Sequence, residues 1–323
     1  CDVALVPGTF AEGDADLNVA QRQLGAARAF WRPDLHAIES RHLMVITPLQ
    51  APGRVALCVA MGELVCETLD RMFAGGSARR DQRFPLQLHL FERQQEYLDY
   101  GAKHGVRTAD LEWTAGHYSP ADDVTRVFLP ADRDAFARVM QVYAHELTHH
   151  WVAQRCPRFS SADKRHTATT PGYWIVEGFA SLLEEFVYDL DTWTCETVNP
   201  RADSLDTLSN LTAKQLLPWV DLLAWSQDDF HRLSKTASLA IPSRWQLGAR
   251  RQLGQIGLFY DQATGICQFL YHADDGRHRA ALFELVELYY TGRYTPADLP
   301  RLTGIAASEL GERVNRFARE RAT

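Results

Sequence analysis

The sequence predicts an α+β fold, with a small mixed sheet in an N-terminal lobe and a mainly helical C-terminal lobe. Strand-like and helix-like segments alternate between residues 36 and 155, whereas the segments after residue 172 have helical spacing only. With 323 residues, 46% of them hydrophobic, the chain can form one large core or two lobes. We divide it into a tail and helix at 1–35, an α+β lobe at 36–155 and a helical lobe at 156–323.

The elements of the first half follow from apolar spacing. Residues 1–16 are rich in turn formers, and a helix is expected at Leu17–Trp31, before Pro33. The next expected elements are a strand at Leu43–Thr47, a helix at Val55–Phe73, a strand at Leu86–Phe91, a helix at Glu92–Lys103, and extended segments at Thr114–Tyr118 and Val124–Leu129. The turn residues Ser119–Asp123 favour a hairpin at a sheet edge.

Helices dominate the rest of the prediction. One helix is expected at Asp132–Gln154, where Asp132 can cap the first turn. After a polar loop, Pro171–Gly172 restarts the chain into a helix at Tyr173–Tyr188. The last expected helices are Trp219–Ala224, Gly254–His272, Arg277–Tyr290 and Ala307–Arg321.

Composition excludes two functional classes. A net charge of -7 with dispersed arginines argues against a nucleic-acid surface, which needs clustered Lys and Arg. A transmembrane segment needs about 20 apolar residues. The best apolar stretch, Val55–Val65, is shorter and contains Glu63, so no transmembrane segment is expected.

The six cysteines do not form a disulfide scaffold of the kind found in short secreted domains. We expect buried thiols, with one candidate bridge, Cys156–Cys195, if the compartment is oxidising. Cys1 leaves two interpretations open: a lipid anchor of a processed, extracytoplasmic lipoprotein, or an arbitrary boundary.

Residues 145–149 read His-Glu-Leu-Thr-His, an HExxH motif within an expected helix. Residues four apart lie on one helix face, about 6 Å apart along the axis, so His145 and His149 can bind one metal ion. Glu146 is rotated by about 100° from His145, where a carboxylate can act as a base beside the metal. The alternative is two core histidines that share this spacing by chance.

A catalytic zinc site needs a third protein ligand and an open position. The metzincin pattern fails, because Val152 and Arg155 stand where Gly and His are needed. Glu177, on the next expected helix, is flanked by Trp174 and Phe179 and is expected to be buried. A buried carboxylate needs a partner, whereas an isolated helical Glu would ordinarily face solvent.

The Trp-x-x-Glu-Gly-Phe-Ala segment at Trp174–Ala180, together with HExxH, resembles the gluzincins, which include the thermolysin-like and aminopeptidase N-like enzymes. The resemblance implies a zincin-like catalytic unit in which His145, His149 and Glu177 hold Zn2+ and Glu146 is the catalytic base. The small Gly178 and Ala180 are expected to let their helix approach the HExxH helix closely.

More distant segments resemble one gluzincin branch, the peptidase MA-like proteins of the DUF1570 type, which are bacterial and often exported. The segments are Leu90–Tyr97, Gly116–Tyr118, Phe259–Ala263 and Gly276–Leu282. The resemblance implies a peptide or protein substrate and an extracytoplasmic location.

Several further residues are candidates for supporting roles. The gluzincin resemblance implies a Tyr or His that donates a hydrogen bond to the oxyanion formed when the peptide carbonyl is attacked. Tyr260 is the first candidate for this donor and Tyr173 is the second. The alternative for Tyr260 is an aromatic residue of the core. Gly116–Tyr118 is the expected strand edge for an extended peptide, with an ordinary hairpin as the alternative. His150 is expected to be a structural neighbour of the metal ligands.

Thermolysin-like enzymes place an Asp four residues after the Glu ligand, to bind a metal-ligating histidine. Ser181 stands at that position here. Glu184 and Glu185 are the alternatives, and at least one of them is expected at the surface.

The expected function is therefore peptide hydrolysis by a zinc metallopeptidase. Two alternatives remain: a non-catalytic zinc-binding relative that acts as a binding or scaffold protein, and a fortuitous motif in an unrelated helical protein. Retention of Glu146 disfavours the first alternative, since a purely structural site needs no base.

Overall fold

The computed structural model describes residues 17–74, 85–106, 111, 114–156, 168–197, 199, 202–236 and 254–321. Two compact units are formed from non-contiguous segments: Cys1–Thr68, Gln82–Trp151 and Tyr188–Glu196 in the first, and Leu69–Asp81, Val152–Val187 and Thr197–Thr323 in the second. The predicted tail, including Cys1, lies outside the described residues.

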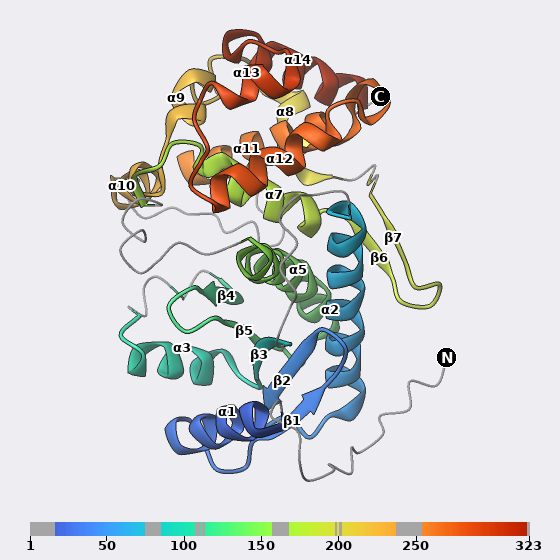
Figure 1. Ribbon diagram of the computed structural model, residues 1–323, viewed down its shortest axis with the longest axis vertical. Coiled ribbons are helices and arrows are strands. Elements are labelled where there is room, and N and C mark those ends of the chain that lie inside the picture. Colours follow the sequence, from blue (N-terminus) through green and yellow to red (C-terminus); the bar gives the residue numbers. More distant parts are fainter. Residues whose placement is uncertain are drawn as a thin grey trace. The chain divides into compact units, whose positions relative to one another are not determined.

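The first unit contains the mixed sheet (Figure 1). Its elements are α1 (Leu17–Phe30), β1 (His36–Glu39), β2 (Leu43–Thr47), α2 (Pro52–Met72), β3 (Leu86–Phe91), α3 (Gln94–Lys103), β4 (Gly116–Ser119), β5 (Val124–Phe128) and α5 (Arg133–Arg155), with the ends of α2 and α5 belonging to the second unit. The strand order is β1-β2-β3-β5-β4. The three inner strands are parallel, and the edge strands β1 and β4 are antiparallel to their neighbours.

Both faces of the sheet are covered, which explains why all five residues of β2 are buried. Met44 and Ile46 pack in a cluster with Ala27 of α1. Leu43, which alternates to the opposite face, lies against Gly62 of α2. A Cβ at Gly62 would lie 2.1 Å from the Tyr143 hydroxyl, so this glycine permits α5 to pack against α2.

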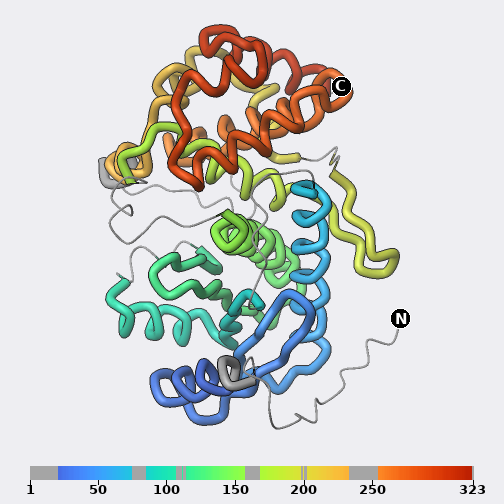
Figure 2. The backbone as a smooth tube through the Cα atoms, in the orientation of Figure 1, coloured from blue at the N-terminus to red at the C-terminus, as the bar shows by residue number. Residues whose placement is uncertain are grey.

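The second unit is helical, and Figure 2 traces its course along the chain. Its elements are α7 (Tyr173–Glu184), α8 (Asp203–Asn210), α9 (Trp219–Ala224), α10 (Gln227–Thr236), α11 (Gln255–His272), the 3-10 turn η1 (Ala273–Gly276), α12 (Arg279–Tyr290), α13 (Asp298–Thr303) and α14 (Ala307–Arg321). Helix α11 is the centre of this unit, because it is buried along most of its length and contacts α7, α8, α12 and α14.

The predicted fold class is confirmed, and the main errors concern short elements. The helix expected at Tyr173–Tyr188 ends at Glu184, because Val187–Asp189 (β6) pairs with Thr194–Glu196 (β7) in a two-stranded sheet. Strand β1 and helices α8 and α13 were not predicted. The bridge between Cys156 and Cys195 is also wrong, since both are free cysteines.

Within the described residues, no helix combines the length and the apolar character needed to cross a lipid bilayer.

Candidate metal centre

Helix α5 positions the HExxH residues. Asp132 caps its first turn, as predicted, by accepting a 2.7 Å hydrogen bond from the N–H of Ala135. Tyr143 and Leu147 have no exposed surface. These two residues share one helix face, four positions apart, and burial of that face fixes the rotation of the helix about its axis.

The two motif histidines face each other across one helical turn. Their Nε2 atoms lie 3.0 Å apart, and the ring planes are inclined by 77°. His145 is buried and His149 is half-buried. Both imidazoles thus present the same nitrogen to one point.

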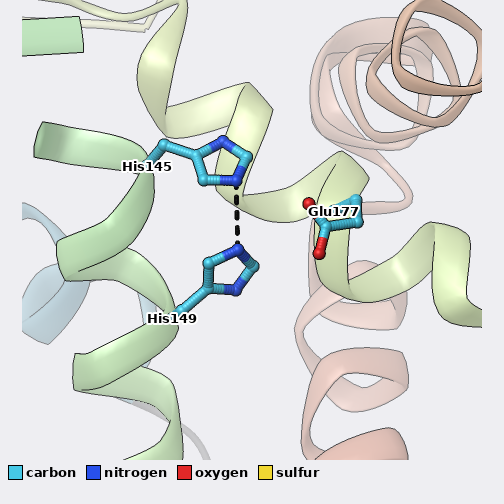
Figure 3. Close-up of side chains that lie close together, drawn as sticks. All are labelled: His145, His149 and Glu177. Carbon is cyan, nitrogen blue, oxygen red and sulfur yellow. Dashed lines mark hydrogen bonds between the residues drawn. The ribbon is translucent and has the colours of Figure 1, made fainter. Parts of the chain in front are cut away.

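Glu177 completes a group of possible ligands. His145, His149 and Glu177 each offer one ligand atom, and these atoms all lie within 4.8 Å of one another. Figure 3 draws these three side chains, the two imidazoles on α5 and the carboxylate on α7. Glu177 is only 6% exposed, as its apolar flanks predict.

The donor set fits a zinc ion. Two imidazole nitrogens and one carboxylate oxygen are the protein ligands of one familiar class of catalytic zinc site. Two nitrogens bound to one tetrahedral zinc at about 2.0–2.1 Å would lie roughly 3.3 Å apart. The observed separation of 3.0 Å is near that value. The side chains of this chain therefore match zinc in donor type and in the spacing of the imidazoles.

Glu146, the second residue of the HExxH motif, is held by the sheet edge. Its Oε2 accepts a 2.7 Å hydrogen bond from the main-chain N–H of Tyr118 in β4. The side chain is half-buried. A carboxylate that is both held in place and accessible can exchange a proton with a bound molecule.

Strand β4 lies at the sheet edge, as predicted, but much of that edge is already paired. The Thr114 hydroxyl donates to the carbonyl of Gly116 over 2.6 Å and accepts a 3.3 Å hydrogen bond from the N–H of the same residue. The N–H of Tyr118 is bonded to Glu146. A peptide that extended the sheet along these residues would have to displace those contacts.

A tyrosine–histidine pair lies beside Glu146. The hydroxyl of Tyr97 and Nδ1 of His117 are 2.8 Å apart. Burial, and then the nearby charge of Glu146, raise the pKa of Tyr97 well above its ordinary value. Burial, followed by the positive charge of Arg126, lowers the pKa of His117 to about 4. Sequence reasoning noted both residues for their resemblance to the peptidase MA-like branch but gave the pair no role.

His150 is a structural neighbour of the ligands, as predicted. Its Nδ1 lies 3.0 Å from the Thr125 hydroxyl, and its ring stacks on Tyr118 at 4.8 Å. These contacts tie α5 to both strands of the hairpin.

The expectation that Glu184 or Glu185 lies at the surface is wrong, because both are buried. The Glu185 carboxylate accepts hydrogen bonds from the N–H of Ser204 (2.8 Å), the Ser204 hydroxyl (2.7 Å) and the Gln268 amide (2.9 Å). These donors belong to α8 and α11, so Glu185 ties its own segment to both helices.

Gly178 lies against α11 and not, as we expected from the sequence, against the HExxH helix. A Cβ at this position would lie 2.4 Å from the carbonyl oxygen of Ala263 in α11. The glycine therefore permits α7 to approach α11, and the sequence-based assignment of this close approach to the HExxH helix is wrong. The packing fixes α7, which carries Glu177, within its own unit.

Tyr260 and Tyr173, the two candidate oxyanion donors, lie in the same unit. Tyr260 is half-buried on α11, and its ring packs edge-on against Phe230. Tyr173 instead donates a 2.6 Å hydrogen bond from its hydroxyl to Oε1 of Glu177. Burial, with the charges of Glu177 and Tyr260, raises the pKa of Tyr173 well above its ordinary value. The spacing of four between Tyr173 and Glu177 was a signal for this contact, since such residues share a helix face.

A scan against protein-family models finds no matching family, and a search of curated proteins finds no matching sequence. The resemblance to gluzincins therefore rests on the motif residues themselves.

Proposed function

We propose that this chain is a zinc-dependent metallopeptidase of the gluzincin type. One observation carries the proposal: the ligand atoms of His145, His149 and Glu177 gather within 4.8 Å of one another, while Glu146 of the same HExxH motif is held nearby. A structural zinc site would use four protein ligands, whereas the three that the described residues offer leave a position for a reactant.

The roles of the side chains follow from their chemistry. When bound, zinc would polarise the peptide carbonyl and acidify a water molecule. Glu146 would accept a proton from the attacking water and pass it to the nitrogen of the departing amine, so that one water is consumed for each peptide bond broken. Tyr260 would donate a hydrogen bond to the carbonyl oxygen as its negative charge develops.

The substrate of this proposal is a peptide or protein, and the proposed location is extracytoplasmic. Both follow from the resemblance to the peptidase MA-like branch. The net charge of -7 favours neutral or basic substrates over acidic ones.

A non-catalytic zinc-binding protein is the second candidate, and one observation favours it. The hydrogen bond from Tyr118 engages Glu146, so this carboxylate has a structural contact besides any role as a base. In that case zinc would be bound but no peptide would be cleaved.

Digestion of a peptide library, read by mass spectrometry, tests the proposal. The zinc-loaded parent and its Glu146→Gln variant are compared at equal metal content. Cleavage by the parent that is lost in Glu146→Gln supports the metallopeptidase. Zinc binding by both without cleavage by either favours the non-catalytic relative.

A further inference from the structure

Tyr173 makes a direct contact with a proposed metal ligand. Its hydroxyl donates a 2.6 Å hydrogen bond to Oε1 of Glu177, one helical turn further along α7. Tyr173 is 9% exposed and Glu177 is 6% exposed, so water competes little for this contact. The hydrogen bond of a neutral donor to a buried carboxylate is a strong one, because one partner is charged.

The tyrosine itself is firmly placed at the start of α7. The main-chain N–H groups of Gly172 and Tyr173 both donate to the carbonyl oxygen of Trp225, over 2.9 and 3.0 Å. Gly172 precedes the helix with φ of 92°, a conformation that favours glycine.

Aromatic packing fixes the ring. The Tyr173 ring lies 5.4 Å from that of Phe230 and 6.1 Å from that of Phe259. The backbone and the ring are thus held by different neighbours, and the hydroxyl has a defined position against Glu177.

We propose that Tyr173 is a positioning residue, which holds the Glu177 carboxylate through Oε1 and so orients it as a metal ligand. This inference rests on the proposed function, because it takes Glu177 as a ligand. It also assigns Tyr173 a different task from oxyanion stabilisation.

The expected size of the effect follows from similar contacts in other metal sites. Hydrogen bonds that orient metal ligands change metal affinity by roughly 10–100-fold when they are removed. Tyr173→Phe deletes only the hydroxyl and keeps the ring in its aromatic surroundings. We expect it to weaken zinc binding by about 10–100-fold.

Zinc affinity, measured by competition with a chelator, tests the inference without any assay of activity. The matched control is Tyr271→Phe, which removes the hydroxyl of another tyrosine of the same unit that is 7% exposed. Weaker zinc binding in Tyr173→Phe alone, with equal thermal stability of the two metal-free variants, supports positioning. Equal affinities in the two variants would overturn it.

Two analogues at position 173 cover the case in which the Phe variant does not fold. 4-Aminophenylalanine and 4-methylphenylalanine fill similar space, but only the first can donate a hydrogen bond. Positioning predicts that the amino analogue binds zinc more tightly, and equal binding by the two analogues contradicts it.

Failure of the inference can be told apart from failure of the proposed function. If the parent binds zinc tightly, Glu177→Ala does not, and Tyr173→Phe matches the parent, then only the positioning role is lost. If the parent binds no zinc, or if Glu177→Ala binds it as tightly as the parent, the ligand set fails and the positioning role fails with it.

Discussion

The main-chain N–H of Tyr118 donates to Oε2 of Glu146 over 2.7 Å, so the edge strand of the sheet holds the proposed catalytic base. The register of the hairpin explains this contact. Phe128 donates to the carbonyl of Ala115, and hydrogen-bonded pairs alternate along antiparallel strands. Tyr118, three positions beyond Ala115, therefore directs its N–H away from β5.

Replacement of Tyr118 by proline removes this N–H without breaking the β4–β5 ladder, since edge strands tolerate proline at outward positions. A hydrogen bond to a charged group contributes about 1.5–3 kcal/mol, or roughly 10–100-fold. We expect Tyr118→Pro to lower kcat/KM for peptide cleavage by about that factor relative to Tyr118→Ala, which keeps the N–H. Equal rates in the two variants would show that the contact does not position Glu146.

Removal of the Tyr260 hydroxyl tests its proposed role in catalysis. Loss of one oxyanion donor lowers kcat by about 100–1000-fold. Tyr260→Phe is therefore expected to show a fall of this size in peptide hydrolysis at unchanged zinc content. An unchanged kcat would assign Tyr260 to the packing of α11 against Phe230, the alternative that the sequence left open.

Addition of a methyl group at Gly178 tests the packing of α7. The new Cβ would lie 2.4 Å from a backbone oxygen of α11, and overpacking of this kind costs about 1–3 kcal/mol. Gly25→Ala is the control, because no atom lies within 4 Å of its added Cβ, and it is expected to be neutral or stabilising by up to about 1 kcal/mol. Urea unfolding of both variants measures the difference, and equal stabilities would contradict the packing account.

The buried His89 predicts a loss of stability in acid. Burial, and then the positive charge of Arg126, lower the pKa of His89 from 6.5 to about 3. At pH values between about 3 and 6.5, the His89 imidazole is protonated in the unfolded chain and neutral in the folded chain. The contribution of His89 to stability is therefore complete above about pH 6.5 and is lost as the pH falls toward 3.

Urea unfolding at pH 7, 6, 5 and 4 measures this contribution. The parent is expected to lose up to about 1.4 kcal/mol per pH unit more than His89→Gln, whose side chain does not titrate. If the free energy of unfolding falls with pH equally in the two proteins, His89 is not a buried histidine that stays neutral in the folded chain.

Periodicity predicted most of the expected elements well, because their patterns reflect burial. Leu43–Thr47, Leu86–Phe91 and Trp219–Ala224 match the structure residue for residue. Strand β1 was not predicted because it has only four residues, His36–Glu39, with polar side chains at both ends. The helix expected to continue to Tyr188 failed because strand pairing with β7 competes with local helical preference.

The motif spacing predicted that His145 and His149 face each other, whereas it did not predict the contacts around them. The spacing of four between His145 and His149 fixes their common face from the sequence alone. The neighbour of Gly178 and the burial of Glu184 and Glu185 depend on which helix packs on which, and a linear pattern does not contain that information. The same holds for the contact of Tyr118, since it uses a main-chain N–H that every residue type except proline could supply.

Zinc content measured by elemental analysis is the most direct test of the central claim, that His145, His149 and Glu177 hold the metal while Glu146 acts beside it. The parent, Glu146→Gln and Glu177→Ala are purified in parallel and equilibrated with zinc. We expect about one zinc per chain in the parent and in Glu146→Gln, and loss of zinc from Glu177→Ala. A parent without metal, or a Glu177→Ala variant that holds zinc as tightly as the parent, would contradict the claim.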